Sequence, residues 1–347
     1  MNRLAVYFTG LKEVEVRQEP IPEVYPGSVL VQSECSAISP GTEMLLYRGQ
    51  APHDLATDDV IPALAGEMRF PFKYGYASVG VVTEVGEGVD RSWEGQRVFS
   101  FNPHETHFLA SPSDLIRIPD SLPTEDAVFL ANMETAVNFL HDGHPLVGES
   151  VAVIGQGVVG LLTTMLLGRI PLAALMTLEP VARRRAVSRS AGAHASFDPS
   201  LEGVQNEVLT ALRRMSASSG FDLSYEVSGS PEALNLAIGL TGDSGRVIIG
   251  SWYGRKQAAL DLGGRFHRSR IEFKSSQVST VDPRLSGRWS KSRRLATALQ
   301  MLTVAKPAQL ITHRFPIGEA SLAYDLLDKH PDEAIQVLLE HSTSKSG

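Results

Sequence analysis

The stretch Ser150-Val-Ala-Val-Ile-Gly-Gln-Gly-Val-Val-Gly-Leu-Leu-Thr-Thr-Met165 decides the fold, because each part of it has its own mechanical task. Residues 151–154 are a short apolar run that suits a buried parallel strand. Gly155 permits a tight turn, Gly157 lets a pyrophosphate approach the backbone, and Gly160 lets the next helix pack closely. Free amide hydrogens at the helix N-terminus can then bind the phosphates. The stretch predicts a dinucleotide site made of Gly155, Gln156, Gly157, Val158, Val159 and Gly160.

A carboxylate ends the second expected strand, which covers residues 175–179. In this position the side chain of Glu179 can bind both hydroxyls of an adenosine ribose and repel a 2′-phosphate. Three arginines follow at 183–185, and arginines after the second strand can also bind a 2′-phosphate. Strand, helix, strand and acid in register favour NAD over NADP as the cofactor.

The composition excludes several classes of protein. A chain of 347 residues is long for one core and fits two domains, and 43% apolar with 20% charged residues is typical of a globular protein. The net charge of −7 argues against a nucleic-acid surface. Cys35 is the sole cysteine, which excludes an internal disulfide. Without a signal peptide or a run of ~18 apolar residues, we expect a cytoplasmic enzyme with a small-molecule substrate and no membrane partner.

The pattern of apolar residues changes along the chain. The first part has short strands bounded by glycine, proline and asparagine, and helical spacing begins at Thr124. Strands then alternate with helices, and the expected strands cover residues 151–154, 175–179, 223–227 and 246–250. One more helix at 291–302 and a strand at 334–339 follow. The alternation predicts an α/β protein with a doubly wound parallel sheet.

This order of elements resembles the medium-chain dehydrogenase/reductase superfamily, whose members include the zinc-binding alcohol dehydrogenases. The matching motifs are Gly80-Val-Val-Thr-Glu-Val-Gly86, Gly95-Gln-Arg-Val98, residues 155–160, Tyr225-Glu-Val-Ser-Gly-Ser-Pro-Glu-Ala-Leu234 and Gly245-Arg-Val-Ile-Ile-Gly250. The resemblance implies a GroES-like β-rich catalytic domain built from residues 1–118 and 277–347. It also implies a Rossmann coenzyme domain at 119–276, with the active site in the cleft between the two.

The resemblance extends to further cofactor contacts. Arg184 matches a position that holds the adenosine ribose, and Thr135 matches one near the nicotinamide. Ser228 and Gly229 match residues beside the cofactor, although they could also be a simple turn after a strand. The apolar strand at 246–252 is expected to lie near the end of the nucleotide sheet, and the family implies a homodimer in which the sheet edge there pairs with its copy.

The zinc ligands of the family have no counterpart in this chain. Ser39 or Pro40 stands where a cysteine would be, Tyr76 replaces the histidine, and Ala131-Asn-Met-Glu134 lies near the third ligand. A hydroxyl, a proline and a phenol cannot replace thiolate and imidazole. His104 and His107 are separated by two residues, but such histidines on a loop are more often hydrogen-bonded. We therefore predict no zinc and no other metal.

Other side chains must then act on the reacting oxygen. Residues 36–43 and 75–80 are most similar to a zinc-less subgroup that includes bacteriochlorophyllide a dehydrogenase. By resemblance Thr42 relays the alcohol proton, and the Tyr76 phenol can donate to a developing alkoxide. Ser39 is close to Thr42 in sequence, and Glu43 or Glu134 could be a general base. Structural roles are also open: Thr42 can cap a turn, Tyr76 can fill the space left by zinc, and Glu43 can anchor a loop.

Three functions fit these residues. The first is a zinc-independent NAD(P)-dependent oxidoreductase that moves a hydride between nicotinamide and a secondary alcohol or ketone. A quinone or enoyl reductase is the second, although such enzymes usually carry an Ala-Gly-Gly-Val-Gly loop and use NADPH. The third is a non-catalytic dinucleotide-binding protein, against which the retained hydroxyls at 39, 42 and 76 argue.

Overall fold

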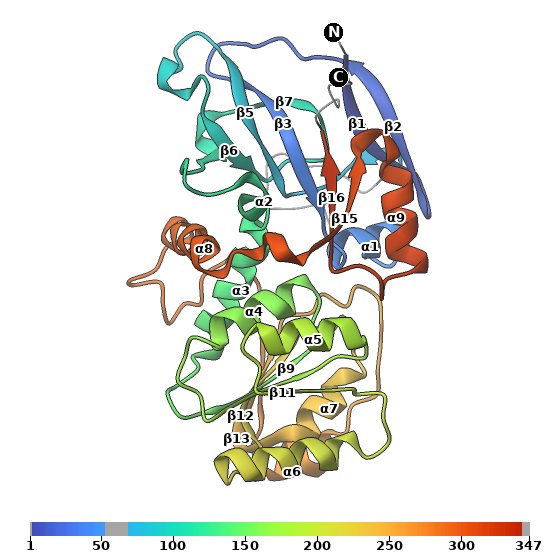
Figure 1. Ribbon diagram of the computed structural model, residues 1–347, viewed down its shortest axis with the longest axis vertical. Coiled ribbons are helices and arrows are strands. Elements are labelled where there is room, and N and C mark those ends of the chain that lie inside the picture. Colours follow the sequence, from blue (N-terminus) through green and yellow to red (C-terminus); the bar gives the residue numbers. More distant parts are fainter. Residues whose placement is uncertain (1, 53–68, 342–347) are drawn as a thin grey trace. The chain divides into compact units, whose positions relative to one another are not determined.

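The chain forms two compact units in the computed structural model, which describes residues 2–52 and 69–341 (Figure 1). The first unit comprises Met1–Ala131 and Lys306–Gly347, and the second comprises Asn132–Ala305. Both boundaries come later than the expected ones at 118/119 and 276/277. The segment from 119 to 131 stays with the β-rich unit because Asp126 accepts the backbone N–H of Ala308 at 2.7 Å. The segment after 276 stays with the second unit because its helix packs against that unit.

The first unit is mostly strand, as the sequence predicts. Its strands are β1 (Asn2–Gly10), β2 (Glu13–Pro20), β3 (Val29–Ile38), β4 (Phe72–Lys73), β5 (Ser78–Val85), β6 (Arg97–Ser100), β7 (His107–Ala110), β8 (Leu115–Arg117), β15 (Ile311–Pro316) and β16 (Gln336–Glu340). Its helices are α1 (Thr42–Tyr47), α2 (Thr124–Ala127) and α9 (Ala320–Lys329), with one-turn helices at Arg91–Trp93, Pro112–Asp114, Pro307–Leu310 and Ile317–Glu319.

The two ends of the chain meet in one sheet of this unit. The strand order is β15-β16-β3-β5-β6-β8, with β7 also paired to β3, while β2-β1-β4 form a smaller sheet. Antiparallel pairing of Val337 with Ile38 and of Leu339 with Ser36 joins the C-terminal strand to β3. Because α1 begins four residues after β3 ends, the C-terminal segment supports the start of α1.

The second unit alternates strands and helices. Its strands are β9 (Ser150–Ile154), β10 (Ala174–Leu178), β11 (Ala195–Phe197), β12 (Phe221–Glu226), β13 (Thr241–Ile249) and β14 (Glu272–Ser275). Its helices are α3 (Leu130–Gly143), α4 (Val158–Leu167), α5 (Ala182–Ser190), α6 (Val204–Ser216), α7 (Ala233–Leu240) and α8 (Lys291–Ala305), with a short π-helical turn at Leu262–Phe266.

All six strands of this sheet are parallel in the order β11-β10-β9-β12-β13-β14, so the predicted doubly wound α/β sheet is confirmed. Successive side chains of a strand point to opposite faces. Ala152 and Ile154 pack in one apolar cluster with α6 and α7, whereas Val151 and Val153 pack in another with Phe139 of α3. Strand order reverses between β9 and β12, where such sheets bind ligands at the carboxyl ends of the strands.

The strand expected near the end of this sheet, at 246–252, has one further neighbour that the sequence analysis did not predict. Residues 246–249 belong to β13, which pairs with both β12 and β14. Within the described residues β14 is outermost on that side. The apolar run of β13 therefore reflects burial between two neighbours, which sequence alone does not distinguish from an apolar edge.

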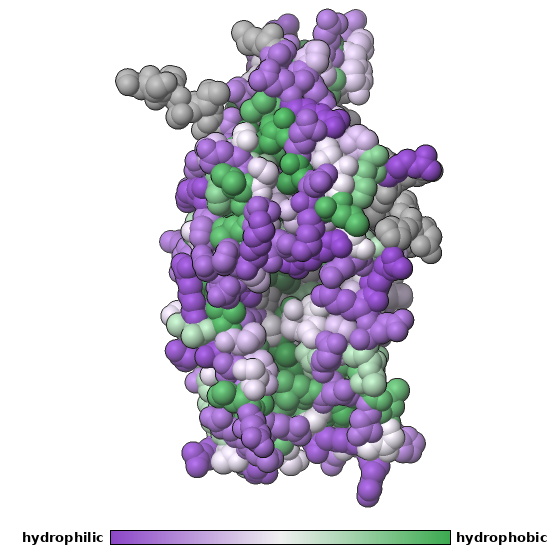
Figure 2. Space-filling model, turned by 90° about the vertical axis from the view of Figure 1, so that its right-hand side faces the viewer, coloured by the Kyte–Doolittle hydropathy of each residue, from purple (hydrophilic) through white to green (hydrophobic). Residues whose placement is uncertain are grey.

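In the described part of the chain, no helix is both long enough and apolar enough to cross a bilayer. On the face drawn in Figure 2, apolar residues stand in several groups that hydrophilic residues separate.

Candidate functional site

The glycine-rich loop, residues 155–160, joins β9 to α4 in the second unit. Gly155 has a φ of +97°, and a Cβ on it would lie 2.5 Å from the Cα of Ser228. A Cβ on Gly160 would overlap the carbonyl oxygen of Gly155. No atom lies within 4 Å of a Cβ built on Gly157, which is the N-cap of α4. Two of the glycines thus allow close backbone packing, and the third leaves the space in front of the helix N-terminus that a pyrophosphate needs.

Glu179 is fixed beside this loop. One carboxylate oxygen accepts the backbone N–H of Gln156 at 2.7 Å and the other accepts that of Val181 at 3.0 Å. Arg184 forms an ion pair with the same carboxylate at 3.8 Å. Because each oxygen has two lone pairs, both can still accept a ribose hydroxyl. Glu179 therefore anchors the loop as well, a task that the sequence analysis did not assign to it.

The side chain of Gln156 points into the protein. Its amide nitrogen donates to the carbonyl of Gly155 at 2.9 Å, and its amide oxygen accepts from the hydroxyl of Thr164 in α4 at 3.0 Å. The residue is fully buried. Gln156 therefore connects the loop to α4, while Val158 and Val159 form the first turn of that helix.

The end of β12 lies next to the loop, because Ile154 pairs with Glu226. Glu226 accepts the N–H of Ser228 at 2.8 Å, and it also accepts the hydroxyls of Ser228 and Tyr253. Gly229, with φ +74°, donates its N–H to the Ser251 hydroxyl at 2.9 Å. The predicted pair Ser228 and Gly229 is thus an ordered turn over a buried carboxylate. The sequence analysis missed Glu226, although it lies within the quoted motif at 225–234.

Helix α3 carries Thr135, which the resemblance puts near the nicotinamide. The adjacent Glu134 forms a buried ion pair with Arg294, whose guanidinium is 2.9 Å away and fully inaccessible. Burial raises the pKa of the Glu134 carboxyl, although Arg294 opposes the shift. Arg294 also binds Asn138 of α3 at 2.6 Å, so this pair fastens α8 to α3. Glu134 is held in a structural contact, which is not the setting of the general base considered above.

In the first unit, three predicted hydroxyls meet at the start of α1. The Tyr76 phenol donates to the Ser39 hydroxyl at 2.5 Å and lies 3.4 Å from the Thr42 hydroxyl. The backbone N–H of Thr42 also donates to the Ser39 hydroxyl at 3.3 Å. Ser39 is buried, whereas Thr42 and Tyr76 are partly exposed. These three residues, hereafter the hydroxyl cluster, come from two segments more than 30 residues apart.

Glu43 lies beneath the cluster and is fully buried. One carboxylate oxygen accepts the N–H of Ser39 at 2.8 Å, and the other lies 3.0 Å from Nε2 of His104 and accepts the Tyr324 phenol. Burial and the Glu43 carboxylate raise the pKa of Tyr324. With both oxygens bonded inside the core, Glu43 has the geometry of an anchor, one of the two roles considered for it. His107, the second histidine considered for a metal, contacts the hydroxyl of Thr106.

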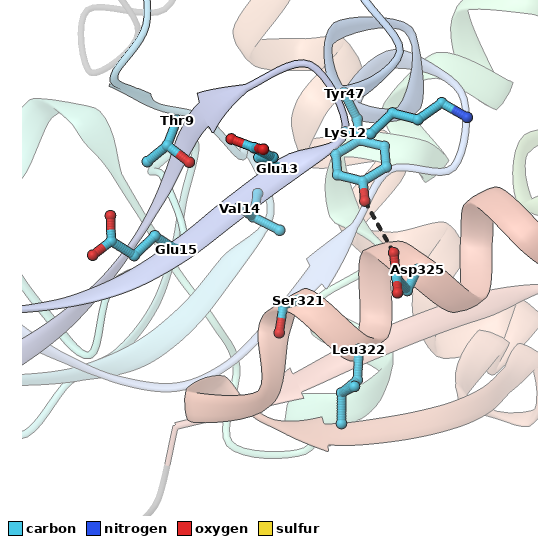
Figure 3. Close-up of a pocket in the computed structure, with 9 residues that line it drawn as sticks. All are labelled: Thr9, Lys12, Glu13, Val14, Glu15, Tyr47, Ser321, Leu322 and Asp325. Carbon is cyan, nitrogen blue, oxygen red and sulfur yellow. Dashed lines mark hydrogen bonds between the residues drawn. The ribbon is translucent and has the colours of Figure 1, made fainter.

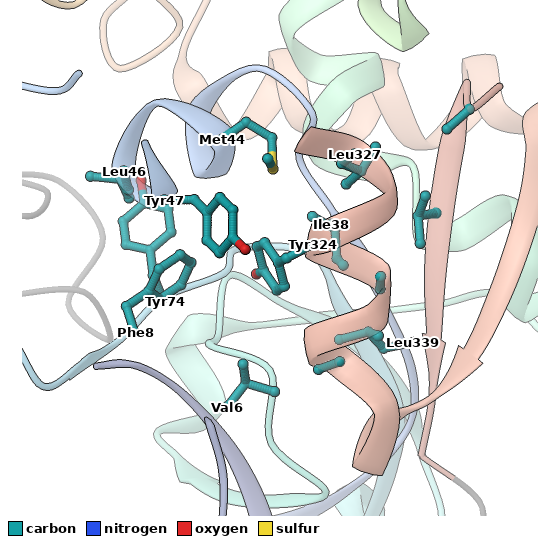
Figure 4. Packing of buried hydrophobic residues seen from close by; sticks show 14 of the residues in the cluster. Val6, Phe8, Ile38, Met44, Leu46, Tyr47, Tyr74, Tyr324, Leu327 and Leu339 are labelled. Carbon is teal, nitrogen blue, oxygen red and sulfur yellow. The ribbon is translucent and has the colours of Figure 1, made fainter. Parts of the chain in front are cut away.

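Helix α9 holds α1 in place through aromatic contacts, which Figure 4 shows, and through polar contacts. The rings of Tyr47 and Tyr324 stack with centroids 5.5 Å apart in the apolar core of this unit. Tyr47 donates to Asp325 at 3.2 Å, and Arg48 binds Asp328 at 2.7 Å. The C-terminal segment thereby fixes the helix that begins at Thr42.

A separate hollow of about 410 Å³ lies on the first unit (Figure 3). It is bordered by the β1–β2 hairpin and α9, and its lining consists of Thr9, Lys12, Glu13, Val14, Glu15, Tyr47, Ser321, Leu322 and Asp325. None of the predicted site residues lines it. Over residues 2–52 and 69–341, no three His, Cys, Asp or Glu side chains gather as metal ligands would.

Comparison with known proteins points to one group of enzymes, although no family model matches the chain. It is 23% identical to an L-threonine 3-dehydrogenase of Caldanaerobacter subterraneus, with 91% of this chain and 92% of that protein covered. It is 26% identical to the 2-desacetyl-2-hydroxyethyl bacteriochlorophyllide A dehydrogenase of Cereibacter sphaeroides, with 96% of each covered.

Solved structures share the fold over almost the whole chain. A short chain alcohol dehydrogenase of Escherichia coli complexed with NADH aligns with a TM-score of 0.78 at 17% identity, covering 98% of this chain and 99% of that one. A putative zinc-binding dehydrogenase of Sinorhizobium meliloti bound to NADP aligns with a TM-score of 0.77 at 20% identity and the same coverage. The GroES-like and Rossmann fold is thereby confirmed. The relatives and structural neighbours are zinc-type alcohol dehydrogenase-like members of the medium-chain dehydrogenase/reductase superfamily, and this chain is an oxidoreductase.

Proposed function

We propose that the protein is a zinc-independent dehydrogenase that moves a hydride between NAD and a secondary alcohol or ketone. The observation that carries the proposal is the hydroxyl cluster, in which Tyr76 donates to Ser39 at 2.5 Å and lies 3.4 Å from Thr42. By the sequence resemblance, these residues correspond to positions that are expected to surround the reacting oxygen in zinc-containing relatives. The relatives named as threonine and bacteriochlorophyllide dehydrogenases support an alcohol as the substrate.

Among residues 2–52 and 69–341, the side chains around the cluster do not suit zinc. Zinc sites use thiolate, imidazole and carboxylate ligands. Cys35 is buried, which raises the pKa of its thiol to about 12 and keeps it protonated. Both ring nitrogens of His104 are bonded, to Glu43 and to Ser36, and the Glu43 oxygens are occupied as described.

The reaction needs a donor and a proton acceptor at the reacting oxygen. Oxidation of an alcohol removes a hydride from the carbinol carbon, which bound NAD would accept, and a proton from the hydroxyl, which must pass through protein groups to water. Tyr76 can turn its single O–H from Ser39 to the alkoxide oxygen, and Thr42, which is partly exposed, can accept the alcohol proton while it releases its own proton to water. Ser39 orders both residues by accepting from the Tyr76 phenol and the Thr42 N–H.

The test compares hydroxyl-deleting variants in a screen of secondary alcohols and ketones with NAD(H). Tyr76→Phe and Thr42→Val should each lower turnover ~100-fold, because removal of one oxyanion donor has effects of that size. Their NAD affinity should stay unchanged, since neither residue belongs to the glycine-rich loop. Tyr25→Phe is the matched control, because Tyr25 is an exposed tyrosine of the same unit. Parental turnover in both variants would contradict the proposed chemistry.

Metal content provides a second, independent test. We expect elemental analysis to find no stoichiometric zinc and activity to persist in a chelator. One zinc per chain, whose removal abolishes activity, would contradict zinc independence.

We also propose a homodimer in the cytoplasm. On its outer side, β14 pairs with no other strand among residues 2–52 and 69–341, and such edges are commonly covered by a second copy. Light scattering at micromolar concentration should give twice the chain mass of 37.6 kDa; a monomeric mass would contradict the dimer.

A further inference from the structure

His104 touches both segments that carry the hydroxyl cluster. Its Nε2 lies 3.0 Å from Glu43, which follows Thr42 in α1. Its ring also fills the space beside Gly75, where an added Cβ would lie 2.9 Å from the imidazole. Gly75 precedes Tyr76 directly, and the backbone N–H of His104 donates to the carbonyl of Tyr74 at 3.4 Å. A single buried ring therefore sets the spacing between the Tyr76 segment and the start of α1.

Glu43 connects His104 to Ser39. Its second oxygen accepts the Ser39 N–H at 2.8 Å, and its side chain is inaccessible to solvent. Ser39 in turn is the acceptor for the Tyr76 phenol. His104, Glu43 and Ser39 thus form one continuous chain of contacts that returns to Tyr76.

The hydrogen-bond partners fix where the protons lie. Nδ1 of His341 is 2.9 Å from the carbonyl of Glu105, which can only accept, so Nδ1 carries the proton. Burial lowers the pKa of His341 to about 3, so the ring is neutral and its Nε2 accepts from Ser36 at 2.8 Å. Ser36 has no second proton, so it accepts from Nδ1 of His104 at 2.7 Å. Nε2 of His104 then faces a carboxylate oxygen of Glu43, and a further proton must lie between them.

Burial of His104 and Glu43 costs free energy, which suggests that the pair has a role other than stability. Two charged groups lose their hydration in the core, and apolar residues of similar volume often stabilise a protein as well as a buried pair does. A buried pair that does have a role usually imposes one specific geometry. Here the geometry that the pair imposes is the contact between Tyr76 and Ser39.

We propose that His104 and Glu43 are positioning residues, which share one proton and hold Ser39 and Tyr76 in the arrangement that binds the reacting oxygen. This inference rests on the proposed function, because it assigns the hydroxyl cluster to that oxygen. The positioning itself is a property of the protein without substrate, and it can be measured separately from turnover.

The first experiment examines the unmodified full-length protein. Nitrogen NMR of histidine-labelled protein near neutral pH should show His341 protonated on Nδ1 alone, and His104 protonated on Nδ1 with a second proton bound or shared at Nε2. The His104 signals are assigned by their loss in His104→Gln. An unprotonated Nδ1 on His104 would overturn the proposal, and this measurement requires no variant to retain its activity.

The second experiment follows the Tyr76 ring carbon that bears the hydroxyl in tyrosine-labelled protein, with Tyr76→Phe for assignment. Glu43→Ala should move this resonance and lower kcat at least tenfold with an unchanged NAD Kd. Glu43→Gln should restore both, because its amide oxygen can still accept from Ser39 while its NH2 donates to His104 and to the phenol oxygen of Tyr324, although Tyr324 loses the acceptor for its own proton. Glu134→Gln is the matched control, since it removes the charge of another buried pair and should leave the Tyr76 resonance in place.

The outcomes separate the two proposals. A Tyr76 resonance that stays unchanged in folded Glu43→Ala would overturn the positioning role, whatever the turnover. If the resonance moves but Tyr76→Phe retains parental turnover, the positioning holds and the proposed function fails. If Glu43→Ala does not fold, Glu43→Gln is compared with the parent instead. The shared proton is supported if Glu43→Gln keeps the parental Tyr76 resonance and its His104 is neutral, with a proton on Nδ1 alone. A His104 that stays doubly protonated in Glu43→Gln overturns it.

Discussion

The glycine-rich loop of the second unit and the hydroxyl cluster of the first reach their geometry by different means. The loop is made of six consecutive residues, and its shape depends on the absence of side chains at Gly155 and Gly160. The cluster depends on side chains from distant segments, held by His104 and Tyr324 from two further ones. A motif of consecutive residues therefore describes the loop almost completely, whereas no local motif describes the cluster.

This difference determines how each region should respond to substitution. Backbone atoms pack directly against backbone atoms in the loop, so there is no space for a single added methyl group. The cluster has bonded side chains whose partners can be exchanged for similar groups. A substitution that adds a single methyl group should thus be strongly destabilising in the loop. Replacement of a residue that holds the cluster by a chemically similar residue should be tolerated.

The largest effect is expected for Gly160→Ala. Its new Cβ would overlap the carbonyl oxygen of Gly155, a backbone atom that cannot move away without shifting β9. We expect a loss of about 3 kcal/mol or more in the free energy of unfolding, together with loss of NAD binding. Urea denaturation and cofactor fluorescence titration measure the two effects.

Two other glycines serve as controls for this substitution. Gly287→Ala should be neutral, because the residue is exposed and no atom lies within 4 Å of the added Cβ. Gly157→Ala meets no atom either, so it should keep the stability and lose affinity only when a pyrophosphate approaches. Equal stability of Gly160→Ala and Gly287→Ala would refute the account of close packing in the loop.

The same contrast explains which features could be predicted from the sequence. The parallel sheet, the loop and the position of Glu179 followed from periodicity and spacing, because these are local properties of the chain. The roles of Glu43 and Glu134 remained open because their partners, His104 and Arg294, are 61 and 160 residues away. The outermost described strand, β14, was not predicted, because a buried inner strand such as β13 and an apolar edge strand have the same composition, and only the pairing of β13 with β14 distinguishes them.

A smaller effect should appear as acid sensitivity in the support of the cluster. Burial lowers the pKa of His341 to about 3, so between about pH 6.5 and 3 the unfolded chain binds a proton that the folded chain does not. Stability therefore falls as the pH is lowered through this window. The contribution of His341 is about 2 kcal/mol between roughly pH 7 and pH 5.

The variant His341→Gln should remove this part of the pH dependence. Glutamine can still accept from Ser36 and donate to the carbonyl of Glu105, but it does not titrate. Chemical denaturation of both proteins at the two pH values measures the difference. An identical pH slope in parent and variant would show that His341 is not the buried neutral group described above.

The smallest expected effect concerns cofactor choice and brings the comparison back to the loop. Glu179 faces the expected ribose with two oxygens, each of which already accepts one backbone N–H. A carboxylate there should disfavour a 2′-phosphate, so we expect NAD(H) to bind more tightly than NADP(H).

Glu179→Ala should narrow this preference for NAD(H) about tenfold, which corresponds to ~1.4 kcal/mol. It should also weaken both cofactors, because the loop loses its bond to the Gln156 N–H. Glu179→Gln separates the two effects: its amide oxygen can keep the bond to the Gln156 N–H, while the charge and the bond to the Val181 N–H are lost, so the preference should narrow with less loss of overall affinity than in Glu179→Ala. Fluorescence titration of both cofactors against the three proteins decides the matter, and equal affinities in the parent would contradict the role of the charge.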